Sequence, residues 1–263
     1  MAIRRFRDHV TRQDWFAVAI DLAIVVVGVF LGMQAANWNQ ARIERSEADE
    51  YRARIVANLR ANETDIRARA NYYRQVRAHA IAALETILSG EVASPEQFLI
   101  DTYQASQGWF RPLQQPSYDE SVDASVRRRV GNAQVRSLLS AYYQQASGFD
   151  SSALGVTAYR DRLRRAMDLR VQLAIRASCD DIMTDLPWGG QVPRLPPSCR
   201  LNLDSSLMQR TARNVAAVPE LDQDLTRLVV DIDQKLGVFR RASRDAARLR
   251  GILEGDGAPA APA

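Results

Sequence analysis

The sequence contains few of the residues from which catalytic and metal sites are most often built. Its 263 residues include only two histidines, His9 and His79, and two cysteines. Lys235 is the single lysine, and Ile232 three residues earlier excludes a Ser-x-x-Lys nucleophile. Because zinc-spaced Cys/His clusters, phosphate-binding glycine motifs and a G-x-S-x-G sequence are also missing, we expect no enzyme activity, no metal and no cofactor.

The composition is also low in the residues that turns and sheets require. Thirteen glycines, ten prolines and 7% aromatic residues are few for a β-sandwich. No run of alternating apolar and polar residues, which is typical of strands, stands out. The basic residues, nearly all arginine, are interleaved with acidic ones for a net charge of only +4. We therefore predict an all-α protein that binds no nucleic acid.

One long apolar run stands near the N-terminus. Residues 16–36 are interrupted only by Asp21 and Gln34, and at about 1.5 Å per residue they reach roughly 31 Å, enough to cross a bilayer. Trp15 and Trp38 flank the run, where aromatic anchors lie at membrane interfaces. A cleaved signal peptide is the alternative, but its apolar region is shorter and ends in a small-x-small site. We predict an uncleaved transmembrane helix over residues 16–37.

The flanking charges indicate the orientation of this helix. Arginine is more frequent before the run than after it, with Arg4, Arg5, Arg7 and Arg12 on one side and Arg42 and Arg45 on the other. Positive residues stay on the cytoplasmic side. We therefore expect residues 1–15 to be cytoplasmic and residues 38–254 to lie outside the cytoplasm, which for a bacterial inner-membrane protein means the periplasm.

The two cysteines fit that compartment, because disulfides persist in the periplasm. Cys179 precedes residues 184–200, and Cys199 lies near the end of this stretch, which is rich in proline and glycine and which we expect to be a loop. A bond between them would close a loop of about 20 residues and contribute roughly 3 kcal/mol on the chain-entropy model. Two free buried thiols are the alternative. A redox-active pair is disfavoured because the sequence has no C-x-x-C.

One face of the membrane helix carries small residues and an acid. Asp21, Val25, Gly28, Gly32 and Ala35 follow a spacing of three and four residues, within about 40° of one line along the helix. The Gly28-x-x-x-Gly32 pair lets a second helix approach closely, so we expect this face to associate with another copy or a partner. Asp21 is either a functional intramembrane carboxylate or an acid near the headgroups that favours the helix dipole.

Apolar positions spaced three and four residues apart continue beyond Trp38 as far as residue 88, and no proline occurs before Pro95. They predict one helix from the membrane to about residue 88, with residues 37–39 as the place for a bend. Ser94-Pro95-Glu96 predicts the start of a short helix that ends near Ser106. Further helices are expected over residues 119–129, 132–147, 152–182, 202–218 and 219–254.

The longest of these segments are amphipathic. In residues 152–182 the predicted apolar side carries Tyr159, Leu163, Ala166, Leu173 and Ala177. The last helix repeats apolar residues at coiled-coil-like spacing, and residues 255–263 form a low-complexity tail with nothing to bury. The transmembrane helix is therefore predicted to continue into an extracytoplasmic antiparallel helical bundle with long coiled-coil-like helices.

A few side chains allow two interpretations. Asp180, Asp181 and Asp185 either form a cation site or are solvated carboxylates beside a loop. Trp109 and Trp188 either line a pocket or pack onto the helices. In both cases the second interpretation is favoured. We expect His79 on a charged helix face.

The membrane segment also resembles a known family. Asp21, a Val/Ile run, Gly28, Gln34 and the exit motif Asn37-Trp38-Asn39 are similar to the N-terminus of an uncharacterised family of bacterial single-pass membrane proteins. Residues 117–120 and 135–143, which end in paired tyrosines, resemble the short-helix region of that family. The resemblance implies a membrane location and a helical extracytoplasmic domain, without an assigned activity. Residues 19–22 alone are similar to proton-driven motor subunits of the Tol and TonB-energising type.

Together these observations predict an interaction or scaffold component of the cell envelope. Its expected contacts are the lipid bilayer and either a second copy or a partner membrane protein. Two alternatives remain open: an accessory subunit of a proton-coupled complex that uses Asp21, and a periplasmic sensor that acts through a partner.

Overall fold

The computed structural model describes residues 15–109, 113, 130–151, 158–186 and 190–255 and shows a mainly all-α protein. Several predicted features lie outside the described residues: residues 1–14 of the segment expected to be cytoplasmic, the short helix expected over residues 119–129, Trp188, and most of the C-terminal tail. Within these residues the helices are α2 (Trp15–Ser89), α3 (Pro95–Ala105), α5 (Ala133–Ser151), α6 (Ala158–Ala166), α7 (Leu169–Ser178), α8 (Ser205–Ala216) and α9 (Leu221–Gly255), and the strands are β1 (Ile182–Asp185) and β2 (Gln191–Arg194).

Helix α2 is 75 residues long and belongs to two compact units of the chain. Its part up to Tyr51 falls in one unit, and the rest of α2 falls in the other, with all the remaining helices and strands. The helix runs without interruption through residues 37–39, where we expected a bend. It ends at Ser89, as the sequence predicts, because Gly90 takes a φ of 72° and donates its N–H to the carbonyl of Ile87.

The first part of α2 has exposed apolar side chains on every face. From Ala19 to Gln40 each residue is exposed, and the large apolar side chains range from 43% exposed at Ile20 to 66% exposed at Trp38. By length and composition this is the one stretch, among the described residues, that could cross a membrane. A signal sequence near the N-terminus would satisfy the same criteria.

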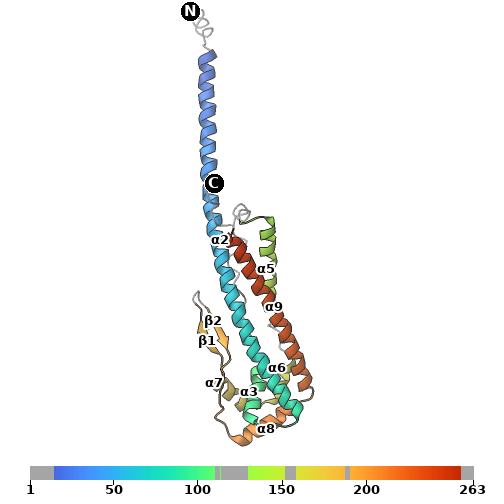
Figure 1. Cartoon of the computed structure of the whole chain (residues 1–263). Helices are drawn as coiled ribbons and strands as arrows, with labels where there is room; N and C mark the ends of the chain where they lie inside the picture. The colour runs from blue at the N-terminus through green and yellow to red at the C-terminus, as the bar shows by residue number, and fades with distance from the viewer. Residues whose placement is uncertain (1–14, 110–112, 114–129, 152–157, 187–189, 256–263) are drawn as a thin grey trace, which may run out of the picture. The chain divides into compact units, whose positions relative to one another are not determined.

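The second part of α2 forms one wall of the domain core. Figure 1 shows α3, α6, α7 and α8 gathered around its C-terminal end and the start of α9. The core there includes Ala80 and Ala83 of α2 together with buried residues of the surrounding helices, namely Phe98, Tyr103, Tyr159, Leu163, Val171, Ile175, Ala212, Val215 and Leu225. Nearer the N-terminal end of α2, the helix contributes to a second core. There the buried side chains of Ile66, Ala70, Tyr73 and Val76 pack with Ile232, Leu236, Phe239 and Ala242 of α9.

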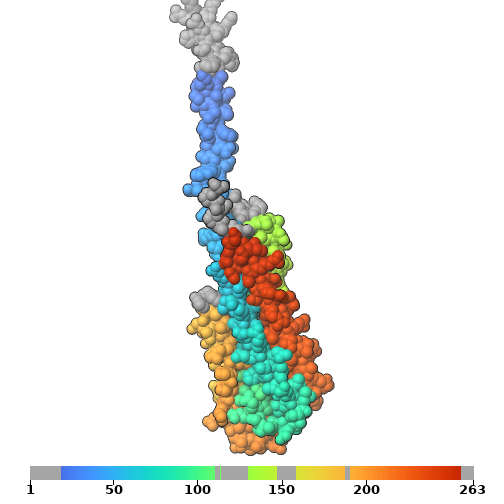
Figure 2. All heavy atoms as spheres, in the orientation of Figure 1, coloured from blue at the N-terminus to red at the C-terminus, as the bar shows by residue number. Residues whose placement is uncertain are grey.

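Helices α2 and α9 run in opposite directions along this second core. The ion pairs that join them include Arg77 with Asp233, Glu63 with Arg250, and Arg60 with Glu254. In Figure 2 the atoms of the two helices lie against each other along the domain. The buried positions of α9 follow the predicted apolar repeat from Leu221 to Leu253, with Leu228 only partly buried.

The helix predicted over residues 152–182 is wrong. The described part contains two helices, α6 and α7, which break at Met167 and Asp168. Asp168 caps α7 by accepting the N–H of Arg170, and the side chain of Gln172 donates to the carbonyl of Met167. The break also changes the buried face, because Val171 and Ile175 are buried whereas Leu173 and Ala177, predicted on the apolar side, are exposed.

The loop predicted over residues 184–200, and the absence of strands, are also wrong in part. Strands β1 and β2 form an antiparallel pair in which Met183 is opposite Pro193. A proline is compatible with a two-stranded sheet because both strands are edge strands. On the outer side of an edge strand no backbone N–H has to donate to a neighbouring strand. Beyond the hairpin, Leu195 donates its N–H to the side chain of Gln75, which fixes this segment on α2. The proline-rich segment therefore forms a hairpin with irregular flanks instead of one continuous loop.

Candidate functional site

The predicted association face lies on the exposed first part of α2. Asp21, Val25, Gly28, Gly32 and Ala35 are all exposed and share one side of the helix. An ideal Cβ placed on Gly28 or Gly32 would meet no described atom within 4 Å. The two glycines thus leave a shallow strip of bare backbone, which is the geometry that allows another helix to approach closely. Asp21 forms no ion pair with any described residue.

The predicted interface anchors are described only in part. The helix begins at Trp15, whose side chain lies outside the described residues. Trp38 is 66% exposed, and the guanidinium carbon of Arg42 lies 5.9 Å from the centre of its ring. An indole and a guanidinium side by side at the end of an apolar run form a pair suited to the headgroup region, where both side chains find polar partners.

The two cysteines are joined. The Sγ atoms of Cys179 and Cys199 form a disulfide with a Cα–Cα distance of 5.4 Å across a sequence separation of 20. Cys179 is the C-cap of α7 and is buried, and its carbonyl accepts a hydrogen bond of 2.7 Å from Nε2 of Gln104 in α3. The bond therefore closes the hairpin segment at its base and attaches that base to the main core.

His79 lies in a polar cluster that the sequence analysis did not predict. Its Nδ1 is 2.7 Å from Oδ1 of Asp101, and the side chain of Gln97 donates to the same oxygen at 2.9 Å. Asp101 is buried on α3, whereas His79 is on α2. The spacing of Gln97 and Asp101 along one helix face could have indicated their pairing, but the sequence holds no signal for the histidine from another helix. The cluster ties α2 to α3.

The three aspartates considered as a cation site have separate partners. Asp181 accepts a hydrogen bond from the hydroxyl of Tyr72, Asp180 accepts the N–H of Asp181, and Asp185 accepts from Gln191 across the hairpin. Burial raises the pKa of Asp181, although its hydrogen bond with Tyr72 acts in the opposite direction. Burial, with the neighbouring Asp181, also raises the pKa of Tyr72. Among the described residues, no three potential ligands are grouped to hold a metal ion.

Trp109 packs into the second core. It is 5% exposed, its ring lies edge-on to that of Tyr72 at 5.9 Å, and the guanidinium of Arg69 lies 5.0 Å from its ring centre. Arg69 in turn forms a buried ion pair of 3.1 Å with Asp65. The backbone N–H of Trp109 donates to the hydroxyl of Tyr73. These contacts correspond to the packing interpretation of Trp109.

Comparisons with protein-family models, with curated proteins and with solved structures give no match. The family resemblance of the membrane-exit motif therefore stays a prediction. Helix α2 thus has two contrasting surfaces: the exposed apolar surface of residues 19–40 and the buried surface in the helical domain.

Proposed function

We propose that the protein is an envelope-anchored interaction protein, with the first part of α2 in the inner membrane and the helical domain in the periplasm. The observation that carries this proposal is the exposure of the apolar side chains between Ile20 and Met33 on all sides of the helix. Apolar surface of that extent is favourable only in an apolar environment, and a length of about 30 Å matches the hydrocarbon core.

Three further features support the orientation and architecture in this proposal. The arginines before residue 15 favour a cytoplasmic N-terminus. The Cys179–Cys199 bond favours an oxidising compartment for the domain. The opposed directions of α2 and α9, with their spaced apolar contacts, support an antiparallel bundle with coiled-coil-like helices. The membrane-exit motif supports membership of the uncharacterised single-pass family that it resembles.

Within this proposal the membrane helix is also a contact element. The strip of Gly28 and Gly32 would pack against a second copy or against a helix of a partner membrane protein. The domain would then act as a scaffold that presents its surface at a fixed place on the envelope. This role requires no catalytic activity of the domain.

Photocrosslinking in native membranes tests the proposal. Probes at Val25 and Gly32 lie on the proposed face, and matched probes at Ala23 and Phe30 lie on the opposite side of the same helix. We expect one defined crosslinked product from the first pair and none from the second, with its composition determined by mass spectrometry. Equal crosslinking from all four positions, or none from any, would contradict an association face.

A second candidate function is favoured by Asp21. A carboxylate within an apolar run, without an ion pair among the described residues, is suited to carry a proton in a complex with a multi-span partner. This function requires that Asp21→Asn abolish the activity of the complex while the complex still assembles, and that Asp21→Glu retain part of that activity. Loss of assembly in Asp21→Asn would instead assign the carboxylate to helix pairing.

A further inference from the structure

The seam between α2 and α9 changes its charge pattern along its length. At one end Arg77 pairs with Asp233, with two nitrogen–oxygen distances of 2.7 and 2.9 Å. At the other end Glu63 pairs with Arg250 at 2.8 Å. Each end thus joins a cation of one helix to an anion of the other. These pairs also fix the register of the two antiparallel helices between them.

The middle of the seam carries arginine on both sides. In the register set by the flanking pairs, Arg67 of α2 is opposite Arg244 of α9, and Arg74 of α2 is opposite Gly237. The Arg240 side chain, one turn farther along α9, reaches back beside Gly237. All four side chains are exposed. Arg67 donates to a backbone carbonyl and Arg74 to the amide oxygen of its neighbour Asn71. Within the described part of the chain, none of the four guanidinium groups forms a close ion pair with a carboxylate, and Arg240 interacts with Asp233 only at longer range.

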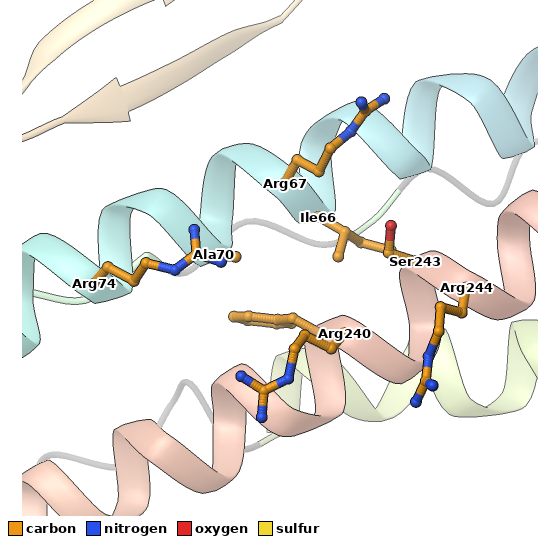
Figure 3. A pocket seen from close by; sticks show the side chains of 8 residues that line it. Ile66, Arg67, Ala70, Arg74, Arg240, Ser243 and Arg244 are labelled. Carbon is orange, nitrogen blue, oxygen red and sulfur yellow. The ribbon is translucent and has the colours of Figure 1, made fainter.

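These four arginines surround a hollow of about 350 Å³. Its remaining lining includes the apolar side chains of Ile66, Ala70 and Phe239. Figure 3 shows Arg67 and Arg74 on α2 and Arg240 and Arg244 on α9. The Arg74 side chain lies along the gap, the Arg67 guanidinium points away from α9, and the Arg240 and Arg244 guanidinium groups point away from α2. The volume is at the lower end of the range for small-molecule sites, and too small to receive a partner helix.

The arrangement is complementary to an anion with an apolar part. Like charges four residues apart on a helix, as those of Arg240 and Arg244 are, are mutually unfavourable. An anion placed between them removes that repulsion. A guanidinium group binds the oxygens of phosphate or carboxylate through two parallel hydrogen bonds. Four such groups exceed what one carboxylate can accept, whereas a phosphate offers three oxygens and up to two negative charges.

We propose that this hollow binds a phosphate-bearing amphiphile. The exposed side chains of Arg67, Arg74, Arg240 and Arg244 turn inward to hold the phosphate, and the apolar part lies on the floor at Phe239. The phosphate is supplied either by a membrane lipid headgroup or by a free phosphorylated molecule. The site does not depend on the association face of the membrane helix, so the two proposals succeed or fail separately.

Isothermal titration of the full chain in zwitterionic lipid nanodiscs tests the site, with hexyl phosphate as the probe. The groove variant is Arg74→Gln/Arg240→Gln. The matched control is Arg210→Gln/Arg227→Gln, which removes the same charge from exposed positions on α8 and α9 outside the hollow. All four positions are exposed in helices, and equal circular dichroism spectra and melting temperatures would confirm that both variants are folded.

We expect hexyl phosphate to bind about tenfold more tightly than inorganic phosphate, because of its buried methylene groups. The groove variant should lose about tenfold or more in affinity and the control variant little. Equal loss in the two variants, equal binding of the two phosphates, or binding of hexanol as tight as that of hexyl phosphate would overturn the proposal. A polyglutamate peptide that binds the groove while hexyl phosphate does not would also overturn it, in favour of an acidic protein partner.

The source of the phosphate is distinguished by competition. Soluble dihexanoyl phosphatidylglycerol, added below its micellar concentration, should displace hexyl phosphate if the ligand is a lipid headgroup with a phosphodiester. If only phosphate monoesters compete, the ligand is a free phosphorylated molecule. Either result supports the site, provided that the groove variant loses the binding and the control variant retains it.

Discussion

The two parts of α2 follow the same spacing of apolar residues and yet have opposite surroundings. In the second part, the positions of Ile55, Leu59 and Ile66 are buried and the other faces carry charges. In the first part, the apolar residues between Ala19 and Gln40 extend around the whole helix and all of them are exposed. The residues outside the three-and-four spacing therefore indicate the environment of the helix. A helix with one apolar face and charged residues on its other faces is typical of a protein core, and a helix that is apolar on all faces is typical of lipid.

The largest effect should come from breaking the buried charge pair of the second part. Arg69→Met leaves Asp65 buried without its cation and removes the guanidinium from the Trp109 ring. We expect a loss of about 3–5 kcal/mol in the free energy of unfolding, measured by urea denaturation of the full chain in detergent. The double variant Asp65→Leu/Arg69→Met should recover most of it. The exposed neighbour Arg67, changed to Gln, should shift the value by less than about 0.5 kcal/mol. An equal loss for Arg67→Gln and Arg69→Met would contradict the account.

A matched pair of leucines compares the two parts directly. Leu59 is fully buried, whereas Leu31 is 60% exposed. Leu59→Ala should lower the free energy of unfolding by about 2–5 kcal/mol, because it leaves a cavity in the core. Leu31→Ala should leave the unfolding transition of the domain unchanged. If the two substitutions had the same effect on domain stability, the first part of α2 would be packed against protein rather than lipid.

Removing the disulfide tests whether the stability of the domain can change while the attachment of α2 to the membrane does not. Cys179→Ser/Cys199→Ser opens a loop of 20 residues and should lower the free energy of unfolding by about 3 kcal/mol on the chain-entropy model. The same decrease should appear when the unmodified chain is unfolded in reducing agent. Membrane retention should not change. No decrease in either experiment would show that the cysteines are unpaired in the protein as isolated.

The smallest effect concerns pH. Because burial raises the pKa of Asp181 above its ordinary value of 3.8, its stabilising contribution is greatest below that value and is lost as the pH rises through the folded-state pKa. Asp181→Asn keeps an acceptor for Tyr72 and removes the buried charge. The decline in unfolding free energy between acid and neutral pH should therefore be smaller in this variant. Asp185→Asn, at an exposed position, is the control and should follow the wild-type pH profile.

Local patterns in the sequence account for much of this fold. The lack of proline before Pro95 and the three-and-four spacing predicted α2 to its last turn, and Ser94-Pro95-Glu96 predicted the start of α3. The spacing of apolar residues also placed the buried stripe of α9. Each of these patterns involves residues only a few positions apart, so it can be interpreted without knowledge of the tertiary structure.

The features that were missed depend on contacts between distant residues or on competing local signals. Asp168 is a good N-cap, but the apolar residues on both sides of it also fit one continuous helix, and only the buried face distinguishes the two. The hairpin was missed because its prolines indicate a loop, while its fixation by Gln75 comes from 120 residues away. The hollow lined by arginines likewise could not be predicted from nearby residues in the sequence. Arg67 and Arg244 come to line one hollow only when α2 and α9 pack in this register.

The central claim is that the first part of α2 remains attached to the chain and lies in the membrane. Mass spectrometry of the intact protein, recovered from membranes washed with alkaline carbonate, tests it directly. We predict that the protein stays in the washed membranes and has the mass of a chain that includes residues 16–37. A soluble protein whose mass corresponds to a chain without these residues would contradict the claim and identify the segment as a cleaved signal sequence.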